Sequence, residues 1–457
     1  MLWTMLLACQ PDTRAGSEPL GVIVVSLDTV RWDHTSLGGY RHDTTPNLAR
    51  LAAQPGSVAF QRAYTPAAWS LPAYASLFTG QEVLTHGVGF IRDTLQPATR
   101  TLAEAFQAHG YQTRAQCSGP HLVADQGFGR GFDVYSHTTS ALPITTQVTD
   151  ALHWLEEERD PSAPFFLFIQ GYDAHFPYAT PAAISEMFDA AAPSRPGGGC
   201  AKACGSARKN NGWRCVPQLF QENGTAGLSS DELSHVTAHY DSAVYYADYQ
   251  LGRLLQGLEE QSLYDRVTLV VLSDHGEGLG EEGRLGHDWD CSEDIFHVPL
   301  LIHQPTDAPP AQEDTVVSLS GLAPTLLALA GIDPPVESDG SRFDALLTGT
   351  GAPPDGRARS ASKQCYTVRD AAWRYTEPWS GADWTPGAPR LRRSGDGEDR
   401  IASEPDAAAT LAADIAGWPR GMDLNEVNAR AGRDNPALQQ ALQEGGYWNA
   451  QPPAGTP

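Results

Sequence analysis

Acidic and imidazole side chains follow directly after three apolar runs of the chain. The runs span residues 21–27, 164–169 and 267–273. The polar residues that come after them are Asp28, Asp173, His175, Asp274 and His275. Carboxylates and imidazoles bind divalent cations and exchange protons with reacting groups. A chemically active site is therefore expected wherever the fold brings the ends of these runs together.

The apolar runs have the length and continuity of buried strands. A strand covered on both faces is apolar along its whole length, as the strands of parallel sheets are. Amphipathic helical stretches, such as residues 101–109 and 239–259, lie between such runs. This alternation predicts an α/β fold with a mostly parallel central sheet flanked by helices. Ligands of such sheets bind outside the carboxyl ends of the strands, which is where the polar residues would lie.

Ser70 opens a segment with the sequence features of a short helix. Pro72 suits the first turn of a helix, and Gly80 suits the position just after its end. The free N–H groups and the dipole of this helix would stabilise an oxyanion bound beside Ser70. The alternative is that Ser70 is an ordinary N-cap, because serine is among the residues preferred there.

A divalent cation would join these residues into one site. The expected ligands are Asp28, Asp274 and His275, together with the hydroxyl group of Ser70. The cation would polarise a sulfate or phosphate ester and would lower the pKa of a coordinated hydroxyl group. Mostly oxygen ligands favour calcium, with magnesium as the next choice, whereas the imidazole leaves manganese or zinc open.

The composition excludes several classes of protein. The 457 residues include 31 Lys or Arg and 55 Asp or Glu, which gives a formal charge of −24. Such a surface repels a polyanion, so nucleic acid is not an expected partner. A hydrophobic content of 41% excludes a disordered chain. Beyond the N-terminus, the sequence lacks the roughly 18 consecutive apolar residues that a membrane span requires.

The N-terminal residues indicate export. The first nine, MLWTMLLAC, resemble the signal of a bacterial lipoprotein, with Cys9 as the lipidated residue. Residues 1–19 would then be a signal-like segment and linker, and the protein would lie in the cell envelope or periplasm, anchored through Cys9. The alternative is an apolar N-terminus without a targeting role. Six cysteines remain besides Cys9, and this even number suits an oxidising compartment without fixing any pairing.

Two parts of the chain depart from the α/β pattern. Residues 193–216 are rich in glycine and cysteine and are interpreted as a surface insertion, held by a disulfide between two of Cys200, Cys204 and Cys215. A zinc knuckle is the alternative, but three cysteines lack a fitting histidine. The basic residues of this insertion could line the path of an anionic glycan or simply face solvent: Arg195, Lys202, Arg208, Lys209 and Arg214. Residues 351–457 are predicted to form a small C-terminal subdomain, with strand-like residues 366–375.

A series of motifs over residues 20–350 resembles the sulfatase family, within the alkaline phosphatase superfamily. The motifs occur in order and include SLDTVRWDH, AYTPAAWSLPAYASLFTG, QGFGRGFDVY, FIQGYDAHFPY, LSDHGEGLGEEGRLGHD and LAPTLLALAGI. The resemblance implies an alkaline phosphatase-like fold for residues 20–350, with a smaller subdomain after it. It also implies a metal-dependent hydrolase of small-molecule or glycan sulfate esters. The sequence does not predict an oligomeric state.

The resemblance assigns roles to individual residues. Asp28, Asp274 and His275 match metal ligands of the family. Ser70 matches the nucleophile position, which active sulfatases oxidise to formylglycine. His175 matches a histidine that contacts the sulfate group, and His287 falls beside the leaving group, where it would act in general-acid and electrostatic catalysis.

Three positions depart from the pattern of the family. Tyr74 replaces an arginine of the modification motif, Thr29 replaces a second aspartate, and His121 lies in a stretch where the expected element is not recognisable. Two alternatives to sulfate ester hydrolysis therefore stay open. An unmodified Ser70 could attack phosphorus, as in a phosphodiesterase, phosphonate hydrolase or phosphotransferase. The chain could also be a catalytically silent binding protein of the envelope.

Overall fold

The protein is described by a computed structural model. The described ranges are 20–89, 93–139, 143–176, 230–283, 285–287, 291–335, 337–362, 364–378, 388–393 and 398–418, together with single positions between 178 and 188. Cys9, the insertion at 193–216 and its three cysteines lie outside the described residues, so the predictions about them stay predictions.

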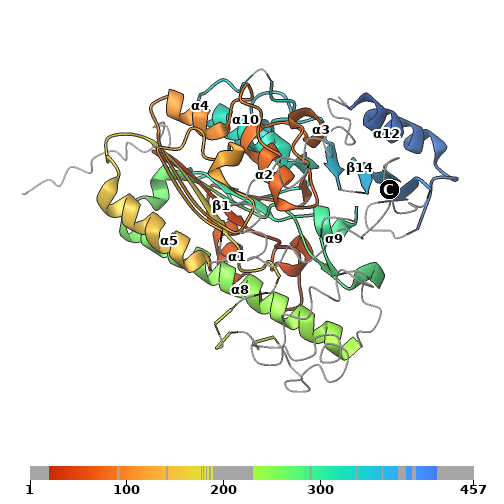
Figure 1. Ribbon diagram of the computed structural model, residues 1–457, viewed down its shortest axis with the longest axis horizontal. Helices are drawn as coiled ribbons and strands as arrows, with labels where there is room; N and C mark the ends of the chain where they lie inside the picture. Colours follow the sequence, from red (N-terminus) through yellow and green to blue (C-terminus); the bar gives the residue numbers. More distant parts are fainter. Residues whose placement is uncertain are drawn as a thin grey trace, which may run out of the picture.

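An eight-stranded mixed sheet forms the centre of the molecule (Figure 1). Its strand order is β11-β2-β10-β7-β1-β6-β4-β5, and all links are parallel except those that β10 makes with its two neighbours. The strands are β1 (Gly21–Leu27), β2 (Ser57–Phe60), β4 (Gln112–Ser118), β5 (Val134–Thr138), β6 (Phe165–Gly171), β7 (Val267–Leu272), β10 (Leu300–His303) and β11 (Ala311–Glu313). The three predicted runs are therefore the adjacent strands β6, β1 and β7, and the predicted fold class is confirmed.

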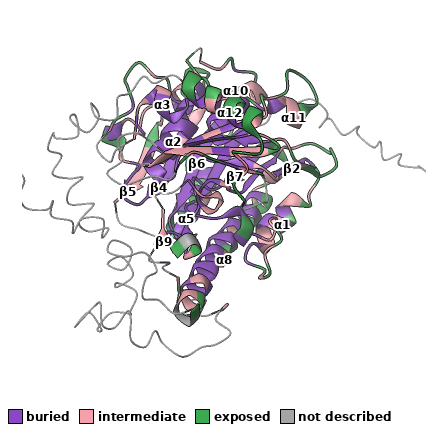
Figure 2. Cartoon of the chain, turned by 90° about the vertical axis from the view of Figure 1, so that its right-hand side faces the viewer, coloured by how far each residue is buried: buried purple, intermediate pink, exposed green. Residues whose placement is uncertain are grey.

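Helices cover both faces of this sheet because alternate residues of its strands point to opposite sides. Ile23 and Val25 of β1 pack into one hydrophobic core, and Val22 and Val24 pack into the other. Figure 1 shows three helices below the sheet, which are α1 (Pro46–Ala52), α5 (Ile144–His153) and α8 (Ser230–Glu260). The opposite face carries α2 (Ser70–Thr79), α4 (Leu102–Ala108) and α10 (Leu322–Leu329). Figure 2 shows the central strands fully buried, as the continuous apolar runs predict.

The helix predicted around Ser70 is present with a small difference at its start. α2 begins at Ser70 itself, after an extended Trp69, and Gly80 ends it in the left-handed conformation with φ of 69°. The N-cap residue is Trp69, whose side chain makes no capping hydrogen bond, and the Ser70 hydroxyl bonds to His275 Nε2. Serine is thus the first residue of the helix, and the alternative of an ordinary N-cap is not what the structure shows.

A small antiparallel sheet lies beside the central one. It runs in the order β13 (Ala358–Ala361), β14 (Cys365–Arg369), β15 (Trp373–Pro378) and β16 (Arg390–Arg393), and α12 (Pro405–Gly417) packs on one face. Short elements connect the rest: β3 (Ala63–Tyr64), α3 (Val83–His86), β8 (Gly278–Leu279), β9 (Leu285–Gly286), α9 (Glu293–Phe296), β12 (Val317–Ser318) and α11 (Asp344–Thr348). None of the helices within the described residues is long and apolar enough to span a bilayer.

A disulfide ties this small sheet to the central domain. It joins Cys291, shortly before α9, to Cys365 at the start of β14. Cys117 is a free, buried thiol on β4. The sequence left the pairing of these cysteines open, because pairing depends on the tertiary fold.

We expect removal of this disulfide to destabilise the protein. Its two cysteines are separated by 74 residues, so the cross-link should contribute roughly 4 kcal/mol by restricting the unfolded chain. The double substitution Cys291→Ala and Cys365→Ala should lower the urea midpoint of unfolding by a matching amount. Reductant should destabilise the wild type and the control variant Cys117→Ala, but not the double variant. An equal urea midpoint for the wild type with and without reductant would contradict this expectation.

Candidate active site

Two adjacent strands bring two carboxylates and an imidazole together at the carboxyl edge of the central sheet. Asp28 follows β1, while Asp274 and His275 follow its parallel neighbour β7. His275 Nε2 lies 3.4 Å from Asp274 Oδ2 and 4.0 Å from Asp28 Oδ1. One ligand atom from each residue falls within 4.8 Å of the others, and all three side chains are buried. We call these three residues the cation group.

The hydrogen bonds of the cation group leave one atom of each side chain facing the others. Gln170 Nε2 donates to Asp28 Oδ2 at 3.0 Å, and two backbone N–H groups, of Thr29 and His275, donate to Asp274 Oδ1. Among the described residues, Asp28 Oδ1 and Asp274 Oδ2 have no hydrogen-bond partner. The Nδ1–H of His275 donates to the Gly276 carbonyl at 2.9 Å, which assigns the lone pair to Nε2.

The electrostatics of this arrangement favour a bound cation. Burial raises the pKa of Asp28 well above its usual range, and the nearby Asp274 raises it further. Two buried carboxylates without a positive partner are costly, since an unpaired buried charge loses its hydration. A divalent metal would pair with the two orphaned oxygens and the imidazole nitrogen. The donor set therefore fits a metal ion.

Ser70 lies directly beside the cation group. Its Oγ is 3.1 Å from His275 Nε2, and the side chain is buried at the N-terminus of α2. Because Nδ1 of His275 carries the proton, the serine hydroxyl donates to Nε2. The structure thus brings together all four residues predicted to form the metal site.

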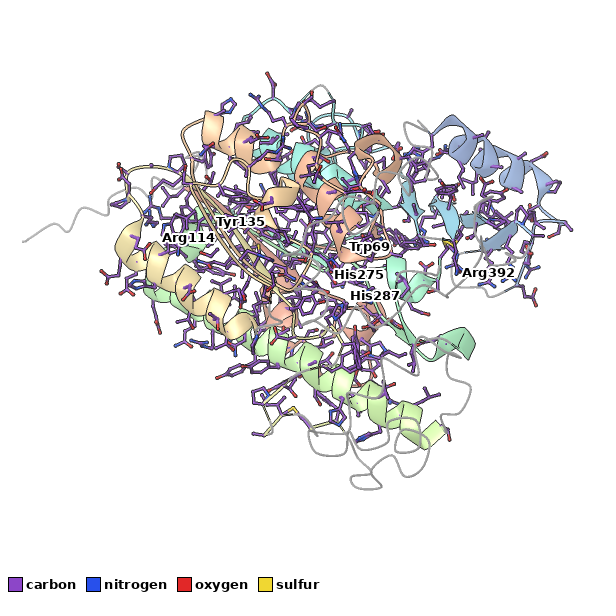
Figure 3. All side chains as sticks on the ribbon, in the orientation of Figure 1. Trp69, Arg114, Tyr135, His275, His287 and Arg392 are labelled. Carbon is purple, nitrogen blue, oxygen red and sulfur yellow. A yellow bond between two sulfur atoms is a disulfide. The ribbon has the colours of Figure 1, made fainter. Side chains whose placement is uncertain are left out.

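Two further predicted histidines extend the cluster. The ring centroid of His287 lies 4.3 Å from that of His275 and 5.0 Å from that of His175 (Figure 3 labels His275 and His287). The ring of His175 stacks on Tyr172 at 4.2 Å. Burial lowers the pKa of His175 well below its usual range, and the neighbouring His287 lowers it further. Both imidazoles are therefore placed to contact a group bound at the cation group.

Glu277 is a site residue that the sequence reasoning missed. Its Oε1 accepts a hydrogen bond from His287 Nδ1 at 2.9 Å, and its side chain is fully buried. A carboxylate on Nδ1 fixes the tautomer and the orientation of an imidazole. The only signal in the sequence is the position of Glu277 two residues after His275, on the same segment.

Asp173 is predicted in the polar site at the strand ends but not as a metal ligand, and its charge lies close enough to Asp28 to raise the pKa of that carboxyl further. Asp173 Oδ2 accepts a hydrogen bond from the backbone N–H of Ile144, at the start of α5. Burial raises the pKa of Asp173 to about 7. The carboxylate therefore holds a helix end, because a free N–H group there needs an acceptor.

Tyr74 has a defined place one turn after Ser70 on α2. Its hydroxyl lies 2.9 Å from Ser26 Oγ, on β1 two residues before Asp28. Burial raises the pKa of the Tyr74 phenol, and the two aspartates of the cation group raise it further. An uncharged phenol therefore stands close to the carboxylates at the position where a positive arginine is expected. His121 packs edge-on against Trp69, next to Ser70, and so borders the site.

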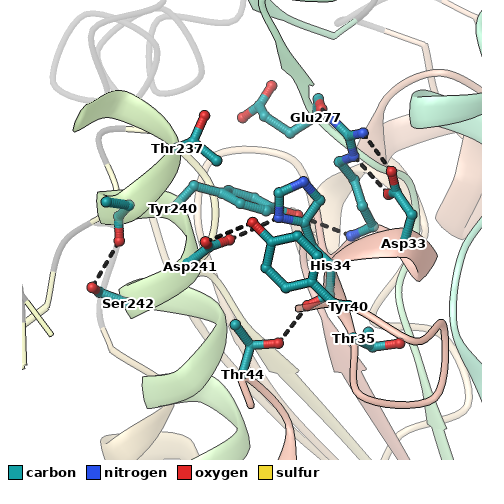
Figure 4. Close-up of polar contacts among 12 residues, drawn as sticks. Asp33, His34, Thr35, Tyr40, Thr44, Thr237, Tyr240, Asp241, Ser242 and Glu277 are labelled. Carbon is teal, nitrogen blue, oxygen red and sulfur yellow. Dashed lines mark hydrogen bonds and ion pairs between the residues drawn. The ribbon is translucent and has the colours of Figure 1, made fainter. Parts of the chain in front are cut away.

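Helix α8 holds the backbone that carries Asp28. Thr29 has a φ of +59°, a conformation that costs energy for a β-branched residue. The buried hydroxyl of Tyr240 donates to the Thr29 carbonyl at 2.7 Å and accepts from the Arg31 N–H at 2.9 Å. The next residue on the helix, Asp241, bonds to His34 Nδ1 and to the Tyr40 hydroxyl (Figure 4). Tyr240 is a positioning residue that no pattern in the sequence indicates.

The sequence is similar to those of known arylsulfatases. An arylsulfatase of Clostridium perfringens is 24% identical over 391 residues, which cover 71% of this chain and 78% of that protein. Arylsulfatase K of Mus musculus is 25% identical over 397 residues, which cover 74% of this chain and 71% of that protein.

Solved structures share the fold. A phosphonate monoester hydrolase of Agrobacterium radiobacter has a TM-score of 0.69 at 20% identity, covering 88% of this chain and 95% of its own. A protein bound to its substrate D-glucosamine-2-N,6-O-disulfate has a TM-score of 0.66 at 17% identity, covering 94% of this chain and 98% of its own. A family model described as Sulfatase matches residues 21–332, a range that contains the cation group, Ser70 and both further histidines. The chain therefore belongs to the sulfatase family of sulfuric ester hydrolases.

Proposed function

We propose that this protein hydrolyses sulfate esters with one divalent cation, calcium, bound by Asp28, Asp274, His275 and Ser70. The observation that carries the proposal is the Ser70 hydroxyl at 3.1 Å from His275 Nε2, beside two buried carboxylate oxygens that have no hydrogen-bond partner among the described residues. Mostly oxygen ligands suit calcium, and magnesium or manganese are the alternatives that metal analysis distinguishes. When bound, the cation polarises the ester and lowers the pKa of a neighbouring hydroxyl group.

The other catalytic roles belong to side chains of the protein. Ser70, or the formylglycine made from it, supplies the nucleophile, and the N-terminus of α2 stabilises negative charge that develops beside it. His175, whose Nδ1–H donates to the Phe176 carbonyl, borders the sulfate group with its Nε2. His287 gives a proton to the leaving oxygen from Nε2, because Glu277 engages its Nδ1.

A second activity is favoured by Tyr74. Its phenol is uncharged and bonded to Ser26, so this position offers no positive group to hold an aldehyde hydrate. An intact Ser70 would then attack phosphorus in a phosphodiester or phosphonate, with the same cation and histidines. The third alternative, a silent binding protein of the envelope, is disfavoured because buried carboxylates without a cation are costly.

Export to the cell envelope, with a lipid anchor at Cys9, is part of the proposal. The disulfide between Cys291 and Cys365 supports it, because disulfides persist in oxidising compartments such as the periplasm. A mass spectrum of the mature N-terminal peptide, isolated from membranes, tests the anchor. An unprocessed N-terminus would contradict it.

Substitution of the nucleophile separates the activities. Ser70→Ala should lower the turnover of an aryl sulfate at least a thousandfold, because it removes the attacking group. The measurement is the initial rate of wild type and variant with two substrates, an aryl sulfate and an aryl phosphodiester. Both proteins are coexpressed with a sulfatase-maturing enzyme and assayed in calcium. A higher rate with the phosphodiester would favour the second activity, and equal rates for wild type and variant would contradict both.

Removal of one carboxylate should release the metal. Asp28→Asn should weaken calcium binding about a hundredfold or more, since it replaces a charged ligand with a neutral one. Asp173→Asn is the matched control, a buried aspartate at a neighbouring strand end that contacts α5 instead. Calorimetric titration of calcium into chelator-treated protein measures both affinities. Equal affinities for the two variants would contradict the assignment.

Loss of the α8 contact should disturb the same site indirectly. Tyr240→Phe should weaken calcium binding about tenfold, the scale of an interaction that orients a ligand. The loss should shrink in a Thr29→Gly background, because glycine adopts a positive φ without support. Tyr40→Phe, which removes a hydroxyl bonded to Asp241, is the control and should bind calcium normally. Equal losses for Tyr240→Phe and Tyr40→Phe would show that the contact does not position Asp28.

A further inference from the structure

Arg31 is a buried side chain that uses all five of its N–H donors. It lies on the segment that follows β1, and its side chain is 3% exposed. Nε and Nη2 donate to the two carboxylate oxygens of Asp33 at 2.9 and 2.7 Å (Figure 4 labels Asp33). Nη1 donates to the Glu281 carboxylate at 2.8 Å and to the Glu277 carbonyl at 3.1 Å, and Nη2 also donates to Asp294 at 3.3 Å. Only a guanidinium group offers five donors in one planar fork.

These hydrogen bonds join three segments that surround the cation group. Asp33 belongs to the segment that follows Asp28, and Asp294 belongs to α9. Glu277 and Glu281 belong to the hairpin of β8 and β9, which begins two residues after His275. We call β8, β9 and the two residues that flank them, Glu277 and His287, the β8–β9 hairpin. Arg31 therefore connects the metal-binding segment of β1 to the hairpin that carries the leaving-group histidine.

The β8–β9 hairpin is too short to keep its orientation alone. Each strand has two residues, and the register pairs Gly278 with Gly286. Glu277 and His287 stand next to each other just beyond this pair, where Glu277 Oε1 accepts the Nδ1–H of His287 at 2.9 Å. An isolated two-stranded hairpin is marginally stable at best, so the direction of the imidazole depends on contacts with the rest of the protein.

Arg31 binds the β8–β9 hairpin at both of its ends. At the base it contacts the Glu277 carbonyl, and at the tip it contacts the Glu281 carboxylate, whose Oε2 also accepts the Leu279 N–H at 2.8 Å. Leu279 and Leu285 pack into a hydrophobic core, which attaches the hairpin to the sheet. Hydrophobic packing is not directional, whereas hydrogen bonds between charged groups are. The bonds of Arg31 therefore determine how the hairpin is turned.

We propose that Arg31 is a positioning residue for His287, because it keeps Nε2 of that imidazole directed at the leaving oxygen of an ester bound at the cation group. This proposal rests on the proposed function. There, His287 gives its Nε2 proton to the leaving oxygen while the sulfur–oxygen bond breaks and its electron pair passes to that oxygen. A misplacement of a catalytic group by about 1 Å can cost about a hundredfold in rate.

The dependence of the rate on the leaving group tests the proposal. An alkyl sulfate needs the proton because an alkoxide leaves poorly, whereas para-nitrophenyl sulfate releases a stable phenolate. Arg31→Lys keeps the buried positive charge but loses the planar fork of donors. It should lower kcat about thirtyfold for the alkyl ester and less than about threefold for the aryl ester.

A second variant keeps the test valid if Arg31→Lys unfolds. Glu281→Gln changes a side chain that is 41% exposed and weakens the contact at the tip of the hairpin, so it should lower kcat for the alkyl ester several-fold. Glu158→Gln is the matched control. Glu158 is 48% exposed and pairs with Arg114 at 3.0 Å, and Figure 3 shows Arg114 far from His275 and His287. This control should keep both rates.

A double-mutant cycle separates positioning from a general loss of structure. In a His287→Ala background, Arg31→Lys and Glu281→Gln should cause no further loss with the alkyl sulfate, because the imidazole that they orient is absent. A further loss of the same size in that background would overturn the proposal. Equal losses for the alkyl and aryl esters in both single variants would overturn it as well.

The proton on His287 Nδ1 provides a measurement that does not need turnover. In the calcium-loaded wild type, the Nδ1–H bound to Glu277 should give a downfield proton NMR signal, which His287→Ala should remove. Arg31→Lys and Glu281→Gln should shift or weaken this signal, and an unchanged signal in both would overturn the proposal. A wild type that turns over neither sulfate ester would contradict the proposed function instead, and the signal would still show whether Arg31 orients the hairpin.

Discussion

Two buried carboxylates at neighbouring strand ends are the constraint on which the rest of the active site depends. Asp28 and Asp274 each keep one oxygen without a hydrogen-bond partner in the described structure, although both side chains are almost fully enclosed. Buried negative charges this close repel each other and lose their hydration. A divalent cation offsets both costs, and the same positive charge can act on a sulfate ester. One bound cation would therefore both stabilise the folded site and activate the ester.

The surrounding elements hold those carboxylates in place. Gln170 of β6 fixes one oxygen of Asp28, and the Thr29 backbone links Asp28 to Asp274. The Thr29 backbone has a strained positive φ, and the hydroxyl of Tyr240 on α8 donates a hydrogen bond to the Thr29 carbonyl. Further along the same helix, Asp248 accepts the free N–H groups at the start of α1. Hydrogen bonds from side chains of α8 thus hold both ends of the segment between Asp28 and α1.

Sequence patterns predict the parts of this account that depend on local order. Continuous apolar runs reveal the central strands, and strand ends in such a sheet meet at one edge, so the cation group could be predicted. The same rule places Asp173 at this edge, but it does not say that this carboxylate accepts a hydrogen bond from the backbone N–H of Ile144 at the start of α5. The contact that Tyr240 makes depends on the placement of α8 against the sheet, which local sequence patterns do not encode. The pairing of Cys291 with Cys365 depends on how the small sheet docks.

The central claim is that one divalent cation binds between Asp28, Asp274, His275 and Ser70. Anomalous diffraction from crystals soaked in manganese, recorded at the manganese edge, tests it most directly, because the signal locates the metal independently of any assay. The account predicts one strong peak at coordination distance, about 2.2 Å, from Asp28 Oδ1, Asp274 Oδ2 and His275 Nε2, with Ser70 Oγ adjacent. A map without a peak there, with the four side chains ordered, would contradict it.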